Sequence, residues 1–141
     1  MNRIVFSSKS DEYPTPDYLY NELNNEFKFT LDPCSTDENA KCSKHYTIND
    51  NGLMQSWENE IVFCNPPYSN VGKWVEKAYQ ERNNATIVML IPARTDTKWF
   101  HNYIYHIAEI RFIKGRIKFD LSVKDKAPFP SMIVIYRRSI I

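Results

Sequence analysis

The apolar run at residues 85–91, Ala-Thr-Ile-Val-Met-Leu-Ile, places the strongest constraint on how this chain of 141 residues folds. A continuous apolar run of this length is typical of a strand covered on both faces, as in parallel sheets. Shorter strand patterns lie at 27–31, 61–64, 109–113, 116–120 and 132–136. We therefore expect an α/β fold with a Rossmann-like sheet, mostly parallel, and an antiparallel edge formed by the closely spaced C-terminal strands.

Helical periodicity separates several of these strands. Leu19, Leu23 and Phe27 recur at i, i+4 and i+8 after Thr15-Pro16, which predicts a helix with Thr15 as N-cap and Pro16 at its first position. A second helix is predicted to begin at Asn70. The remaining helical patterns span roughly 96–107 and a short polar stretch at 36–44, whereas 48–60 has the composition of a loop.

The composition is that of one globular domain, which we expect to span residues 1–141. No run approaches the roughly 18 apolar residues of a membrane span, and the first residues are too few for a signal peptide, so we expect a soluble intracellular protein. Cys34, Cys42 and Cys64 match no common spacing of zinc ligands, and no metal site is expected.

Charge is unevenly divided along the chain. Residues 1–91 hold 8 Lys and Arg against 13 Asp and Glu, whereas residues 92–141 hold 10 against 4. Such asymmetry points to a polyanion-binding face in the C-terminal part. A solvated basic surface without a partner is the alternative.

Asn65-Pro66-Pro67-Tyr68 follows the apolar run 61–64 and indicates a loop that holds an exocyclic amino group. An amine conjugated to a ring is a poor nucleophile, and acceptors such as the Asn65 side-chain oxygen and the Pro66 carbonyl would free its lone pair. Pro66 and Pro67 fix the backbone, and Tyr68 offers a face on which a base stacks. An ordinary turn is the competing interpretation, because such residues are common in turns.

Ligands bind at the carboxyl ends of strands in sheets of this kind. We expect that edge to gather Asp32, Asn65, 92–94 and 115–116. Trp74, Trp99 and Phe100 lie on apolar helix faces and are assigned to the core, whereas Trp57 could serve either the core or the site.

The order of short motifs resembles the phage-type DNA N-6-adenine methyltransferases, a small Dam-like family. The resemblance covers roughly residues 12–136. It rests on Thr15-Pro16, Leu31-Asp32-Pro33-Cys34-Ser35, Asn39-Ala40, Asp50-x-Gly52-Leu53, Trp57, Phe63-Cys64-Asn65-Pro66-Pro67-Tyr68-Ser69, Pro92-Ala93-Arg94-Thr95-Asp96-Thr97, Trp99-Phe100 and Gly115-Arg116-Ile117-x-Phe119.

The resemblance implies a Rossmann-like fold, S-adenosylmethionine as cofactor and adenine in DNA as substrate, without a metal. The target base would be flipped out of the duplex. Phage origin, and protection of phage DNA from host restriction, would follow from the family alone. The implied residues are catalytic Asn65, Pro66, Pro67 and Tyr68; cofactor-binding Thr15, Pro16, Asp32, Pro33, Cys34 and Asp50; and DNA-binding Arg94, Lys98, Arg116 and Lys118.

One departure from larger amino-methyltransferases concerns the cofactor. Those enzymes follow the Asp-Pro step with a glycine-rich loop, whereas this chain has Cys34-Ser35-Thr36 there and only three glycines. Asp32 and Thr15 could instead be local caps without ligand contact. The rival functions are methylation of RNA or of a protein glutamine, and an inert nucleic-acid or nucleotide-binding module.

Overall fold

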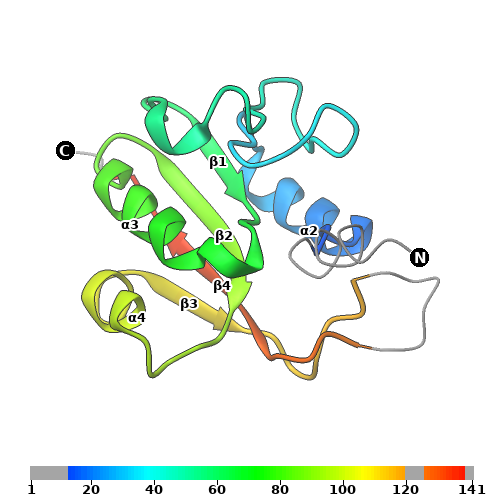
Figure 1. Cartoon of the computed structure of the whole chain (residues 1–141), viewed down its shortest axis with the longest axis vertical. Helices are drawn as coiled ribbons and strands as arrows, with labels where there is room; N and C mark the ends of the chain where they lie inside the picture. Colours follow the sequence, from blue (N-terminus) through cyan, green and yellow to red (C-terminus); the bar gives the residue numbers. More distant parts are fainter. Residues whose placement is uncertain (1–12, 120–125, 139–141) are drawn as a thin grey trace.

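The computed structural model describes residues 13–119 and 126–138, which form a four-stranded mixed sheet with helices on both faces (Figure 1). The strands are β1 (Ile61–Cys64), β2 (Thr86–Pro92), β3 (Glu109–Phe112) and β4 (Ser131–Tyr136), in the order β1-β2-β4-β3. The helices are α2 (Asp17–Phe27), α3 (Val71–Glu81) and α4 (Lys98–Tyr103), with short 3-10 turns at Gly52–Met54 and Tyr68–Asn70.

Strand directions differ from the expected sheet. β1 and β2 are parallel, but β4 is antiparallel to both of its neighbours, β2 and β3. The sheet is thus less parallel than predicted, and the antiparallel strand lies inside it rather than at its edge. Because β1 is parallel to β2, and β2 and β3 are each antiparallel to β4, these three strands run in one direction and end at the same edge. Leu31 adds a single parallel bridge to Val62 beside β1.

The alternation of side chains along β2 and β4 divides the core into two layers. Ile87, Met89 and Ile91 belong to the layer that includes α3 and α4, and Val88 and Leu90 belong to the layer that includes α2 (Figure 1). Every residue of β4 is buried, and β2 is buried from its second residue onward. Burying one such aliphatic side chain stabilises the fold by about 1.5–3 kcal/mol, so this central pair anchors the molecule.

The helices follow the predicted periodicity with altered ends. α3 begins after Asn70 as predicted, although the Asn70 side chain makes no capping hydrogen bond. The helix predicted over 96–107 is limited to Lys98–Tyr103, capped by Thr97 Oγ1, which accepts from Phe100 N at 3.2 Å. α2 begins at Asp17 with Pro16 at the N-cap position, so the prediction of Thr15 as N-cap is wrong.

The predicted strand at 27–31 is largely a helix end. Lys28 adopts a left-handed conformation (φ 60°) and its N–H donates to Asn24 O at 2.9 Å, which closes α2. Phe27 and Phe29 stack on each other with ring centroids 5.8 Å apart. Their alternation with Lys28 therefore arises from a helix cap followed by a turn, and only Leu31 and Asp32 make strand-like bridges.

Two other predicted elements are absent from the described chain. The stretch 36–44 forms turns because side chains satisfy its backbone: Asn39 Oδ1 accepts from Thr36 N at 2.7 Å, and Thr36 Oγ1 accepts from Asn39 N at 3.1 Å. Residues 116–119 form no strand, although Ile117 O accepts from Ala127 N at 2.8 Å. Residue 120, the end of that predicted strand, lies outside the described residues.

No helix among the described residues is long and apolar enough to span a membrane. Within 13–119 and 126–138, no three His, Cys, Asp or Glu side chains gather in a group that could hold a metal ion.

Candidate active site

β1 delivers Asn65 to the edge of the sheet where three strands end. Asn65 follows the buried β1 residues Phe63 and Cys64. Pro66 is buried, and Pro67 has φ −58° and ψ 139°, so the backbone turns away extended before the 3-10 turn at Tyr68–Asn70 leads into α3. The two prolines leave this connection few alternative conformations.

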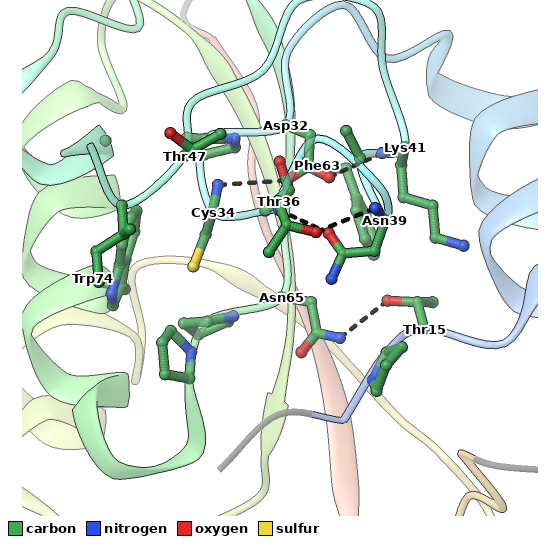
Figure 2. Close-up of a pocket in the computed structure, with 18 of the residues that line it drawn as sticks. Thr15, Asp32, Cys34, Thr36, Asn39, Lys41, Thr47, Phe63, Asn65 and Trp74 are labelled. Atoms are coloured by element: carbon green, nitrogen blue, oxygen red, sulfur yellow. Dashed lines mark hydrogen bonds between the residues drawn. The ribbon is translucent and has the colours of Figure 1, made fainter. Parts of the chain in front are cut away.

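The Asn65 amide is held in one orientation. Its Nδ2 donates to Thr15 Oγ1 at 3.0 Å (Figure 2). It also donates to Tyr13 O at 2.5 Å, and both acceptors come from the segment before α2. Thr15 is 5% exposed, so its hydroxyl is a fixed partner. With both Nδ2 hydrogens directed to these acceptors, Oδ1 points the other way and accepts no hydrogen bond from the described residues. The amide thus presents a preorganised acceptor.

A cavity of about 810 Å³ opens beside this amide. Its walls come from the segment before α2, the loops after Leu31 and around Gly52, and the connection from β1 to α3; we call it the main cavity. Small-molecule sites typically have volumes of about 300–1,000 Å³. The predicted site residues that line it are Thr15, Asp32, Pro33, Cys34, Asn65, Pro66 and Pro67.

Asp32 is the buried carboxylate of the main cavity, with 4% of its surface exposed. Its Oδ2 accepts from Lys41 N at 3.0 Å and its Oδ1 from Cys34 N at 3.3 Å, so it holds the loop between them (Figure 2). Burial raises the pKa of Asp32 to about 6, although these two N–H groups and the charges of His45 and Lys41 lower it. Its charge is therefore sensitive to whatever cation lies nearby.

The loop over the main cavity is tied down by polar contacts of its own. The Tyr20 hydroxyl donates to Lys41 O at 3.1 Å, and His45 Nε2 lies 2.8 Å from Asp37 Oδ1. The pKa of His45 is raised, chiefly by that contact with Asp37. These bonds fix the position of the segment that carries Thr36 and Asn39 into the cavity wall.

The opposite wall is formed around Gly52. A Cβ added to Gly52 would lie 2.0 Å from Pro33 O and 3.0 Å from the Trp74 ring, so only glycine fits. The Gly52 carbonyl accepts from Trp57 Nε1 at 3.1 Å. Trp57 is fully buried and stacks against Trp74 at 6.3 Å, which assigns Trp57 to the core.

A second, much smaller cleft lies on the other side of Asn65 and Pro66. Its aromatic walls are Tyr13, Tyr68, Phe119 and Phe129, and we call it the aromatic cleft. The ring centroid of Tyr68 lies 4.9 Å from that of Phe129 and 5.8 Å from that of Tyr13. The Arg94 guanidinium lies 4.3 Å from the Tyr68 centroid, within cation–π range. The aromatic cleft is thus largely filled by its own side chains.

Comparison with known proteins identifies the family of this chain. Residues 4–140 match the family model described as DNA N-6-adenine-methyltransferase (Dam). The chain belongs to this family. It is therefore a DNA adenine-N6 methyltransferase by membership, as the sequence motifs predicted.

Two phage proteins are among its relatives. The chain is 33% identical over 117 residues to the DNA N-6-adenine-methyltransferase of Haemophilus phage HP1 (strain HP1c1), covering 79% of this chain and 68% of the relative. It is also 33% identical over 120 residues to the DNA N-6-adenine-methyltransferase of Escherichia phage T1, covering 83% of this chain and 50% of the relative. The match therefore spans about half the length of the second protein.

The structure brings most of the predicted methyltransferase site together. Asn65, Pro66 and Pro67 share the main cavity with Asp32, while Tyr68 lines the aromatic cleft beside them. The expected meeting of the strand ends thus holds for Asp32, Asn65 and Pro92, which also lines the aromatic cleft.

Other predicted residues lie apart from the two cavities. Pro16 is buried at the start of α2, and Asp50 lines neither cavity. The Asp50 carboxylate accepts from Thr47 N at 2.9 Å and so stabilises its own turn. Lys98 and Arg116 are exposed and Lys118 is half-buried, all outside the lining of both cavities. Their proposed DNA contacts stay predictions.

Sequence reasoning did not assign the residues that come to the site from distant segments. Tyr13, Phe129 and Ser131 line the aromatic cleft, and Trp74 lines the main cavity from α3. Trp74 lies on the apolar face of a predicted helix, so its sequence pattern indicates a core residue. No local pattern distinguishes Phe129 or Ser131 from strand and turn residues, because their role depends on β4 lying next to β2.

Proposed function

We propose that the main cavity holds S-adenosylmethionine and that the Asn65 loop presents the exocyclic amine of a flipped-out adenine to it. The observation that carries the proposal is the fixed Asn65 amide, whose Nδ2 is held by Tyr13 O and Thr15 Oγ1. An acceptor that needs no reorganisation stabilises charge developing on the amine at low cost.

The residues of the main cavity suit a cationic cofactor. Asp32 is buried, Asp37 and Glu38 also line the wall, and Lys41 is the basic residue beside them. S-adenosylmethionine would supply the methyl group on its positive sulfonium. Asp32, with a pKa near 6, would be held ionised by a neighbouring cation, which strengthens binding as the carboxylate loses its proton.

The chain's own groups would activate the amine. Asn65 Oδ1 and the Pro66 carbonyl would accept its two hydrogens, favouring a pyramidal nitrogen with a free lone pair. Tyr68 would stack on the base once the Arg94 guanidinium has left its ring. Arg94, Lys98, Arg116 and Lys118 would neutralise DNA phosphates near the opening.

The topology supports a reduced Rossmann-like arrangement in one domain over residues 1–141. Three strands run one way, Leu31 adds a parallel bridge beside β1, and β4 is inserted in the opposite direction. The main cavity lies where β1 ends, and the aromatic cleft lies where β1 and β2 end, the usual ligand position in open α/β sheets.

Labelled S-adenosylmethionine, incubated separately with DNA, RNA and cell protein, tests the substrate. We expect label in DNA adenine, and label only in RNA or protein would reject the assignment.

Asn65→Ala should lower the methylation rate by about 100-fold or more while calorimetric cofactor affinity changes little. Asn83→Ala, an exposed asparagine at the far end of α3, is the matched control. Near wild-type turnover by Asn65→Ala would refute the mechanism.

A further inference from the structure

Ser131, the first residue of β4, carries a hydroxyl that the described structure leaves without a partner. Ser131 is 2% exposed, and its Oγ is one of two buried side-chain polar atoms, with Trp74 Nε1, that make no hydrogen bond in the described part of the chain. Buried polar groups in native proteins are almost always paired, so an unpaired one calls for an explanation. Alanine would fill the same place in the core without this cost.

The position of Ser131 directs it to the substrate side of Asn65. Ser131 lies opposite Pro92 in the β2–β4 register, and alternation puts it on the same sheet face as Ile133 and Ile135, the face of α2. Asn65 follows Phe63 by two residues and continues the same face from β1. The two polar side chains therefore lie on the same face of the sheet.

The aromatic cleft contains both groups. It is lined by Ser131, Asn65, Pro66 and the aromatic walls already defined. In the closed arrangement the walls fill the space, and the Ser131 hydroxyl is sealed beneath them. If a base replaces Arg94 on Tyr68 with its amine at Asn65, its ring edge enters the space above Ser131.

Hydrogen-bonding chemistry decides what the hydroxyl would do there. The exocyclic amine of adenine donates both of its hydrogens, which Asn65 Oδ1 and the Pro66 carbonyl are proposed to accept. The ring nitrogens that flank this amine, N1 and N7, only accept. Serine can donate through its O–H, whereas the apolar side chains of the cleft cannot.

We propose that Ser131 Oγ donates a hydrogen bond to a ring nitrogen of the target adenine, and so helps the enzyme to select its base. This inference rests on the proposed function, because it needs the amine at Asn65. It explains why a buried apolar stripe of β4 begins with an unpaired hydroxyl: the partner is the substrate. A base that presents a ring C–H at this position would leave the hydroxyl without a partner.

The test combines Ser131→Ala with adenine analogues. Duplex oligonucleotides carry adenine, 1-deazaadenine or 7-deazaadenine at a position that the wild-type protein is found to methylate, and kcat/KM is measured for each. We expect Ser131→Ala to lose about 10-fold on adenine. For one of the two analogues, kcat/KM of the wild type should fall by a similar factor. On that analogue, kcat/KM of Ser131→Ala should be no lower than kcat/KM of the wild type.

A purely structural serine gives a different pattern. Ser131→Ala would then lose the same factor on adenine and on both analogues, or lose nothing on any, and either result would overturn the inference. Thermal unfolding should show Ser131→Ala to be as stable as the wild type, and marked destabilisation with uniform loss of activity would also count against it. If the wild type methylates no adenine, the proposed function fails first, before any variant is compared.

Discussion

Asp32 makes the stability of this fold depend on pH in a direction that is unusual for a carboxylate. Burial raises its pKa from 3.8 to about 6. The folded protein therefore binds a proton that the unfolded chain has already lost between these values. Stability from the protonated group is fully present below pH 3.8 and is lost as pH rises through about 6.

The shift sets the size of the effect. A difference of about two pKa units corresponds to about 3 kcal/mol between the two protonation states. Asp32→Asn removes the titration, so the free energy of unfolding of the wild type, relative to this variant, should fall by about 2–3 kcal/mol from pH 4 to pH 7.5. Glu26, Glu60 and Glu109, whose pKa values are lowered, titrate in both proteins and cancel in the difference.

Urea unfolding at closely spaced pH values, followed by tryptophan fluorescence, measures this difference. The free energy of unfolding of Asp32→Asn also differs from that of the wild type by an amount that does not depend on pH, because the amide has one oxygen and cannot accept from both Lys41 N and Cys34 N as the carboxylate does. Only the change with pH matters. A relative stability that is flat between pH 4 and 7.5, or that rises, would show that Asp32 is ionised without penalty and that the argument from burial is mistaken.

Three further outcomes are expected. Thr15→Val keeps the shape of the side chain but removes the acceptor at 3.0 Å from Asn65 Nδ2, so kcat should fall about 10-fold with little change in cofactor affinity. An equal loss in kcat and in cofactor affinity would contradict this. Gly52→Ala forces a Cβ to within 2.0 Å of Pro33 O and should destabilise the fold by about 1–3 kcal/mol in urea titrations, which an unchanged midpoint would exclude. The double variant Arg116→Ala/Lys118→Ala should flatten the plot of log DNA affinity against log salt by up to about 2, since each phosphate contact contributes about 0.9; an unchanged slope would place the DNA elsewhere.

The sequence was most informative where a local pattern of apolar residues shows which side chains are buried. The run at 85–91 predicted β2, the run at 132–136 predicted β4, and the spacing after Asn70 predicted α3. In each case one local period determines which side chains face the core. The same holds for the Asn65 loop, because its prolines restrict the backbone whatever surrounds it.

Prediction failed where side chains compete with the backbone or where partners are distant. Thr36 and Asn39 bond backbone groups that a helix would have used, and Lys28 reverses the chain within an apparent strand. Thr15 looked like a cap because its true partner, Asn65, lies 50 residues away. The interior position of β4 was also hidden, since strand order depends on packing between segments and not on local period.

The aromatic cleft joins the two ends of the described chain, with Tyr13 from its first residue and Ser131 from its last strand. During synthesis, β1, β2 and α3 all emerge before the segment that completes this cleft. A nascent chain that ends before β4 thus lacks both the strand that joins β2 to β3 and a finished place for a base. Activity should then appear abruptly at the end of folding, and fragments cut before β4 should be inert toward DNA even when they retain the Asn65 loop.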